Sequence, residues 1–262
     1  MPPTISGPLH AEVMGRAEDP PMIFVHPNPL DSACWIFQMA HFSTWYRTVA
    51  VDLPGYGRSP TATAEVTMGD IAEACWEVAD RLAPGPAILV GCSVGSAMVQ
   101  HMYHLRPESV RAIALSGTGY NPVKAHVPKR IAEYRELGLP HRHSHALQDL
   151  SPAFRETPLA HWFAQLFVER NNTADLDTII NMFAALGAPE PEHADLHTPV
   201  LIITGSEDNS HQRAFDLRDR LPDGELITME GAGHACYMEQ PWVWDQHLLE
   251  FLDRRGLRQP GA

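Results

Sequence analysis

The chain contains few cysteines and no long apolar run. Its four cysteines lie far apart, and two of them, Cys75 and Cys92, fall in segments that we expect to be buried; the others are Cys34 and Cys236. This spacing favours free thiols in a reducing compartment over a disulfide framework. No apolar stretch approaches the roughly 20 residues that a helix needs to cross a bilayer, and the first twenty residues lack the basic start and apolar run of a secretion signal. We therefore expect a soluble cytoplasmic protein.

Basic residues are also fewer than acidic residues. Lys and Arg total 19 against 32 Asp and Glu, which gives a formal charge of −13 with His neutral, and the acidic residues are scattered along the chain. This balance argues against nucleic acid or an anionic membrane as a partner. Histidine is frequent, but the histidines of the central stretch lack the ligand spacing of a known zinc motif, so we expect no metal. They are His126, His141, His143, His145 and His161.

The 262 residues are 44% hydrophobic, enough to bury the core of one large α/β domain. Short apolar or β-branched runs recur and end in Gly, Pro or polar residues, which is typical of buried parallel strands. Helical patterns separate most of these runs, so we predict a doubly wound, mostly parallel sheet with helices on both faces. The predicted strands are Met22–Val25, Thr48–Val51, Ala87–Val90, Val110–Leu115, Val200–Thr204 and Glu225–Met229, with Leu9–Met14 as an open candidate for an edge strand.

The alternation stops between residues 119 and 197. This stretch carries helical patterns at Arg130–Leu137, Leu159–Glu169 and Leu176–Leu186 and no strand signal. We expect it to form a helical cap over the ends of the strands, with residues 1–118 and 198–262 forming the core.

The segment Gly91-Cys92-Ser93-Val94-Gly95 follows one predicted strand and precedes a helix. In that context a G-x-S-x-G match predicts a nucleophile elbow, a sharp turn that exposes the serine. The strained turn needs small neighbours, which Gly91 and Gly95 supply. The turn also puts Ser93 at a helix N-terminus, where the amide of Val94 is available to an oxyanion.

A serine nucleophile needs a base within hydrogen-bond reach and a carboxylate to orient that base. His234 lies in a glycine-rich loop after the last predicted strand, and Asp208 follows the strand before it. The order Ser, Asp, His fits this architecture. Glu207 is the rival acid. For the second oxyanion donor we select the backbone N–H of Asn28, because Pro27 and Pro29 have none.

Several motifs resemble those of the α/β-hydrolase superfamily across nearly the whole chain. The segment His26-Pro27-Asn28-Pro29 is similar to the HGxP oxyanion loop, with Pro27 where the family usually has Gly, and residues 52–59 are similar to its D-x-P-G-x-G-x-S turn. Asn28-Pro29 also resembles the loop of haloalkane dehalogenases and epoxide hydrolases. Those relatives attack with an Asp at the elbow, so Ser93 argues against both activities.

The resemblance implies a cap inserted after the sixth strand, with side chains that shape the substrate pocket. The candidates are Trp162, Phe163, Phe167, Met182 and Phe183. It also implies a serine hydrolase that cleaves an ester or lactone of a small, fairly apolar substrate and needs no metal or organic cofactor.

Two alternatives stay open. One is a carbon–carbon bond hydrolase of aromatic ring-fission products, in which an arginine in or near the cap is expected to bind the substrate carboxylate. The other is a non-catalytic small-molecule receptor on a hydrolase scaffold. For the first alternative, the candidate arginines are Arg130, Arg135, Arg142, Arg155 and Arg170. The sequence also leaves open whether the protein forms a homodimer.

Overall fold

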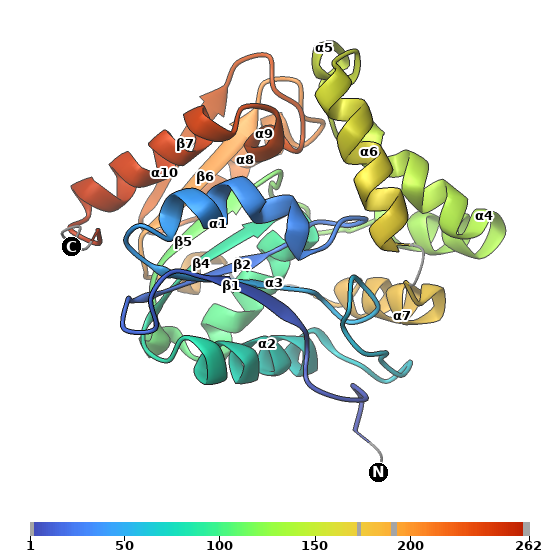
Figure 1. Ribbon diagram of the computed structural model, residues 1–262, viewed down its shortest axis with the longest axis horizontal. Coiled ribbons are helices and arrows are strands. Elements are labelled where there is room, and N and C mark those ends of the chain that lie inside the picture. Colours follow the sequence, from blue (N-terminus) through green and yellow to red (C-terminus); the bar gives the residue numbers. More distant parts are fainter. Residues whose placement is uncertain (1–2, 172–173, 190–192, 259–262) are drawn as a thin grey trace.

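A computed structural model describes residues 3–171, 174–189 and 193–258. Seven strands form one sheet in the order β1-β3-β2-β4-β5-β6-β7 (Figure 1). All neighbouring strands are parallel except β1 and β3, which are antiparallel. The strands are β1 (Ala11–Met14), β2 (Pro21–Val25), β3 (Arg47–Val51), β4 (Ala87–Cys92), β5 (Val110–Ser116), β6 (Val200–Gly205) and β7 (Gly224–Met229). The predicted parallel sheet is confirmed, and the candidate edge strand is β1.

Burial on both faces of the sheet explains why the strands are continuous apolar runs in the sequence. In β6, Val200 and Ile202 pack into one hydrophobic cluster, whereas Leu201 and Ile203 pack into the other. Successive residues of a strand point to opposite faces, so a sheet covered on both sides needs apolar residues at every position.

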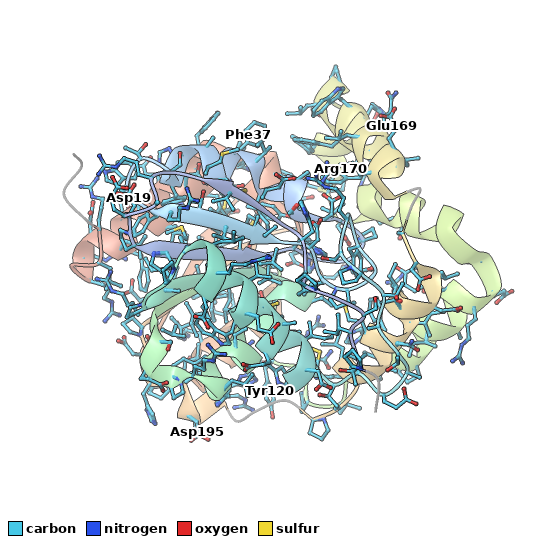
Figure 2. The ribbon with its side chains drawn as sticks, turned by 60° about the horizontal axis from the view of Figure 1, so that its bottom comes forward. Asp19, Phe37, Tyr120, Glu169, Arg170 and Asp195 are labelled. Carbon is cyan, nitrogen blue, oxygen red and sulfur yellow. The ribbon has the colours of Figure 1, made fainter. Side chains whose placement is uncertain are left out.

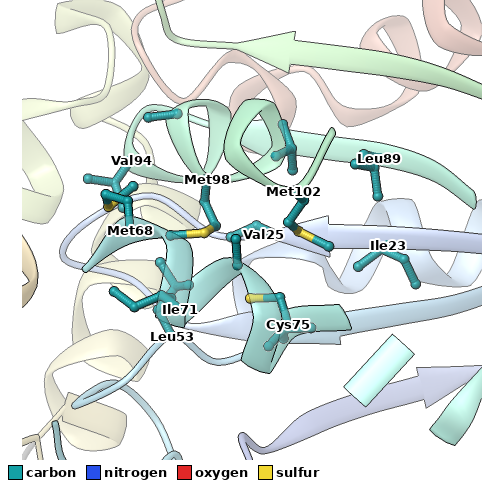
Figure 3. Close-up of a cluster of buried hydrophobic side chains, with 14 of the residues drawn as sticks. Ile23, Val25, Leu53, Met68, Ile71, Cys75, Leu89, Val94, Met98 and Met102 are labelled. Carbon is teal, nitrogen blue, oxygen red and sulfur yellow. The ribbon is translucent and has the colours of Figure 1, made fainter. Parts of the chain in front are cut away.

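Helices cover both faces of the sheet. The helices α1 (Ile36–Phe42) and α10 (Pro241–Arg254) lie on one face, and α2 (Met68–Leu82) and α3 (Val94–Leu105) lie on the other (Figure 1). On the latter face, Ile71 and Cys75 of α2 and Met98 of α3 belong to one cluster of buried hydrophobic side chains (Figure 3). The other helical elements described in the core are η1 (Ser32–Trp35), η2 (Pro107–Ser109), α8 (His211–Arg218) and α9 (Cys236–Glu239), and η3 (His193–Asp195) directly precedes β6 in the chain.

In the described part of the chain, four α-helices lie between β5 and β6 and gather at one end of the molecule (Figure 1). Helix α4 contacts both α6 and α7. They are α4 (His126–Gln148), which is interrupted at Gly138, α5 (Pro152–Arg155), α6 (Pro158–Asn171) and α7 (Leu176–Leu186). This helical insertion follows the fifth strand of the chain, so its expected position after the sixth was wrong. The sheet has only one strand, β1, beyond β3 at this edge. One strand fewer therefore precedes the insertion than the resemblance implied.

The described helices of the insertion share the two hydrophobic clusters of the sheet domain. Ile179 and Phe183 of α7 belong to the cluster beneath α2 and α3, and Phe163 and Phe167 of α6 belong to the cluster beneath α1 and α10. The cap is therefore packed onto both layers of the sheet domain. Among the described residues, no helix is long and apolar enough to cross a membrane.

Candidate active site

Ser93 occupies the turn between β4 and α3 in a strained backbone conformation. Its φ of 53° and ψ of −115° lie outside the regions that a residue with a side chain ordinarily adopts. The Ser93 N–H donates to the carbonyl oxygen of Ser116 on β5 at 3.0 Å. A conformation of this kind costs about 1–3 kcal/mol and persists only where the surrounding structure enforces it.

The two glycines of the elbow leave no room for a side chain. A Cβ on Gly91 would lie 2.3 Å from the carbonyl oxygen of Gly95, and a Cβ on Gly95 would lie 2.1 Å from the carbonyl oxygen of Val25. Both obstacles are backbone atoms, which cannot rotate away. The steric reason for the glycines, predicted from the sequence, is thus present in the fold.

His234 and Asp208 form a hydrogen-bonded pair. The Nδ1 of His234 lies 3.0 Å from Oδ1 of Asp208. The same carboxylate accepts hydrogen bonds from the N–H of Ser210 at Oδ1 (2.8 Å) and from the Ser210 hydroxyl at Oδ2 (2.7 Å). Glu207 also lines the cavity at this site, but the carboxylate that holds His234 is that of Asp208.

Each partner of this pair changes the pKa of the other. Burial opposes the charge on Asp208, but the charge and hydrogen bond of His234, together with the bonds from Ser210, outweigh it and lower the Asp208 pKa to about 2. Burial likewise opposes the imidazolium, but Asp208 and, more weakly, the charge of Asp149 raise the His234 pKa to about 9. The side chain of His234 stays 21% exposed, so it is accessible from the cavity.

The loop that carries His234 is held by a residue that the sequence analysis missed. Oε1 of Glu239 accepts hydrogen bonds from the N–H groups of Gly233 (3.0 Å) and Ser151 (2.8 Å), and Oε2 accepts one from the Ser151 hydroxyl (2.6 Å). Glu239 therefore joins the histidine loop to the start of α5 in the cap. No sequence motif marks this residue, because its cap partner is distant in the chain.

Gly117 is a second residue that sequence reasoning missed. A Cβ on it would lie 2.8 Å from the carbonyl oxygen and 3.0 Å from Cε1 of His234, and its φ of +52° favours glycine. No sequence motif singled out Gly117. In the structure its lack of a side chain makes room for the histidine.

The loop after β2 is fixed by its own first residue. Nε2 of His26 accepts a hydrogen bond from the N–H of Leu53 (2.9 Å), so the proton of this neutral ring sits on Nδ1, which donates to the carbonyl oxygen of Pro27 (2.9 Å). The same Pro27 oxygen accepts from the N–H of Leu30 and closes a tight turn. Proline at position 27 is compatible with this arrangement because the turn uses its carbonyl group and not an N–H.

Asn28 lines the same cavity as Ser93. Its Oδ1 accepts a hydrogen bond from the Tyr56 hydroxyl (2.7 Å), and its Nδ2 donates to the Tyr134 hydroxyl (2.9 Å). With the side chain held by tyrosines from the core and from α4, the backbone of Asn28 has a fixed orientation. Within the described part of the chain, no acceptor binds the backbone N–H of Asn28 or of Val94.

The cavity between cap and core has a volume of about 640 Å³ and is lined by Ser93, Asp208 and His234 together with Asn28 and Val94. Thus the five residues that the sequence assigned to the triad and the oxyanion hole meet at one site. No three His, Cys, Asp or Glu side chains in the described part of the molecule are grouped so as to hold a metal ion. Of the central histidines, His126 lines the cavity, while the side chains of His141, His143 and His145 lie outside the described part.

The five side chains expected to shape the substrate pocket lie in different places. Phe183 lines the large cavity, and Phe163 and Phe167 line a second, very small cavity of about 10 Å³ that also borders His234. Neither of these two cavities is lined by Trp162 or Met182. Trp162 is 56% exposed and Met182 is buried in the core. Adjacent helical residues lie about 100° apart, so Trp162 cannot share the face that Phe163 and Phe167 form at a spacing of four.

A buried ion pair ties the cap to the oxyanion loop. Nε of Arg170, in the last turn of α6, lies 2.7 Å from Oδ2 of Asp31, whose carboxylate is fully buried. Figure 2 labels Arg170 beside Glu169 on α6. Asp31 follows Asn28 by three residues. The position of the cap and the position of the oxyanion loop are thus coupled.

Comparison with known proteins agrees with this arrangement. The sequence model of the alpha/beta hydrolase family matches residues 22–244. The chain is 24% identical over 258 residues to the (E)-2-((N-methylformamido)methylene)succinate hydrolase of Acinetobacter baylyi, covering 93% of this chain and 94% of that protein. It is 28% identical to a carboxylesterase of Bacillus subtilis over 256 residues, covering 94% and 84%. Its fold is similar to that of the enol-lactonase of Burkholderia xenovorans LB400, with a TM-score of 0.83, 18% identity and coverage of 94% and 96%.

Proposed function

Because the chain belongs to the alpha/beta hydrolase family, we propose that it is a serine hydrolase that cleaves the ester or lactone bond of a small substrate through an acyl-enzyme. The observation that carries this proposal is the shared cavity of Ser93, Asp208 and His234, with His234 oriented by its 3.0 Å bond to Asp208. Esterases and lactonases among the similar proteins support it.

In the first half of the reaction, Oγ of Ser93 attacks the carbonyl carbon while Nε2 of His234 takes its proton. The negative charge moves to the carbonyl oxygen, where the amides of Val94 and Asn28 stabilise it. Collapse of this intermediate breaks the bond to the leaving oxygen, which receives the proton from His234. Asp208 stabilises the imidazolium throughout but does not take the proton itself.

In the second half, water attacks the acyl-enzyme and gives its proton to His234. The bond to Ser93 Oγ then breaks, and the proton returns to that oxygen as the acid leaves. Both halves use the same base and the same oxyanion donors, so the proposed chemistry requires only the side chains and amides already described.

The test compares the wild type with Ser93→Ala and with Ser43→Ala, a serine outside the cavity. Hydrolysis of p-nitrophenyl acetate is expected from the wild type and Ser43→Ala but not from Ser93→Ala above the uncatalysed rate. A fluorophosphonate should add one adduct to the peptide that contains Ser93. A wild type that neither hydrolyses the ester nor gains the adduct would favour the receptor hypothesis. Turnover of a ring-fission ketone by a protein inactive on esters and lactones would favour the carbon–carbon hydrolase.

A further inference from the structure

The cavity gathers cationic side chains in a chain that carries a net charge of −13. Four cationic side chains line it, namely Lys124, Arg130, Arg155 and Arg213. The acidic side chains that line it are Asp149, Glu207 and Asp208, of which Asp208 is paired with His234. The local charge balance therefore differs from that of the whole molecule.

Two of these cations differ from most other arginines of the described chain in their ion pairing with carboxylates. Arg106, Arg170 and Arg255 each pair with carboxylates, and Arg130 pairs with Glu133 at 3.1 Å. By contrast, Arg155 and Arg213 have no carboxylate within ion-pair distance in the described parts of the chain, although acidic residues outnumber basic ones.

Arg155 is held in place by neutral groups. Its Nε donates to the carbonyl oxygen of Leu150 and its Nη2 donates to that of Gln148, both at 2.8 Å. These two bonds orient the guanidinium without neutralising it. A guanidinium has five N–H donors, so further donors stay available to a ligand.

Arg213 lines the same cavity and belongs to the core. It belongs to the first turn of α8, five residues after Asp208, and its Cβ lies 2.6 Å from the position that a Cβ on Gly119 would take. Its charge lowers the pKa of the nearby His234, opposing Asp208. Its side chain makes no hydrogen bond within the described residues. Thus one arginine from the cap and one from the core face the same cavity as Ser93.

We propose that the cavity selects esters or lactones that carry a free carboxylate, and that Arg155 and Arg213 bind this carboxylate. The planar guanidinium matches the two oxygens of a carboxylate and can donate two parallel hydrogen bonds to them. The inference rests on the proposed function, because it names the substrate class of that same site.

The kinetic test uses two esters of similar shape. Monomethyl succinate carries a carboxylate, and methyl 4-methylpentanoate has an isopropyl group in its place. We expect the wild type to prefer monomethyl succinate in kcat/KM. Arg155→Gln and Arg213→Gln should each lower the ratio of the two kcat/KM values by about 10- to 100-fold, the range of one charge-assisted hydrogen bond. The ratio is insensitive to any loss of correctly folded protein.

Arg218→Gln is the matched control. Arg218 lies on α8 like Arg213, pairs with Asp219 and does not line the cavity. This variant removes the same charge from the same helix and should leave the ratio unchanged. A wild-type ratio near one, or a ratio that neither cavity variant lowers, would overturn the inference.

A binding experiment separates this inference from the proposed catalysis. Calorimetry with Ser93→Ala should show tighter binding of succinate than of neutral succinamide at matched ionic strength, and the added Arg213→Gln change should reduce the difference. Hydrolysis of neutral esters with equal binding of both probes overturns the carboxylate site and leaves the hydrolase. Preferential succinate binding without any hydrolysis by the wild type supports the site and overturns the hydrolase.

Discussion

At the residue scale, the chemistry depends on the environment of two ionisable groups. His234 must be neutral to accept the proton of Ser93, yet Asp208 stabilises its protonated form and raises its pKa to about 9. The same pairing holds the ring in the tautomer with a proton on Nδ1, which leaves Nε2 to act as the base. Asp208 therefore orients the ring of His234, and it also raises the pH that is needed for this ring to be neutral and act as the base.

Replacement of Asp208 should be far more damaging than replacement of its neighbour. We expect Asp208→Asn to lower kcat on p-nitrophenyl acetate by about 10³- to 10⁴-fold, because the ring loses its anchor and its preferred tautomer. Glu207→Gln, one residue earlier, should stay within about threefold of the wild type, because the bond that orients His234 comes from Asp208. Equal losses in the two variants would contradict the assignment of the acid.

The pH profile should reveal the charges around His234. We expect kcat/KM to rise with pH through an inflection well above 6.5, as His234 loses its proton. Asp149 raises the His234 pKa and Arg213 lowers it, so Asp149→Asn should move the inflection to lower pH and Arg213→Gln should move it to higher pH. Initial-rate assays on a neutral ester across the neutral and alkaline range measure both shifts. Shifts of the same sign would contradict this account.

At the scale of single elements, close backbone contacts and one ion pair position the site. The elbow requires α3 to begin against the end of β2, which only a residue without a side chain permits at position 95. The cap is held against the oxyanion loop by Arg170 and Asp31. Both features fix the distance between elements that carry different parts of the active site.

Two glycine substitutions should have opposite effects on stability. Gly95→Ala puts a methyl group 2.1 Å from a backbone oxygen, and we expect it to cost about 3 kcal/mol or more. Gly69→Ala, in helix α2, meets only an ordinary contact at 3.6 Å and should stabilise the protein by about 0.5–1 kcal/mol through helix propensity. Urea unfolding of both variants measures the difference. A mild effect at position 95 would contradict the close approach of α3 to β2.

Removal of Arg170 should leave a buried, unpaired carboxylate. We expect Arg170→Met to lower the free energy of unfolding by about 3 kcal/mol, because Asp31 is fully buried. Asp31→Asn in the same protein should recover most of this loss, since Asn still accepts the bond from the N–H of Ala33. The control is Arg218→Met, which removes one partner of the exposed Arg218–Asp219 pair. It should change the free energy of unfolding by less than about 1 kcal/mol.

At the scale of the whole molecule, a buried acid that does not line the cavity makes the stability depend on pH. Burial between α1 and α10 raises the pKa of Asp245 from 3.8 to about 7, although its bond from Nε2 of Gln38 opposes the shift. Between these two pH values the folded protein binds the proton and the unfolded chain does not. The contribution of Asp245 to stability should therefore fall as the pH rises from about 4 to 7.

Asp245→Asn should remove this contribution. The amide keeps an acceptor for Gln38 and carries no charge, so the Tm of the variant minus that of the wild type should increase between about pH 4 and 7, and the variant should exceed the wild type above that range. Asp216→Asn, on the exposed side of α8, is the control and should follow the wild-type curve. A variant with an unchanged slope would contradict the role of Asp245.

Local sequence patterns determined most of the fold and the identity of the reacting groups. Strands covered on both faces need unbroken apolar runs, and a strained strand-to-helix turn needs glycines on both sides of Ser93, so both features can be read from neighbouring residues. The positions of Ser93, Asp208 and His234 follow from the same logic, because loops at the ends of parallel strands meet at one edge of the sheet.

The tertiary structure alone decided how the cap meets the core. Helical periodicity gave the extent of α7 but not which of Met182 and Phe183 turns toward the cavity, because the answer depends on what packs against the helix. The contacts of Glu239 with Ser151, of Tyr134 with Asn28 and of Arg170 with Asp31 join residues 88, 106 and 139 positions apart. Such pairs leave no local signal, and they fix the walls of the cavity that opens onto Ser93.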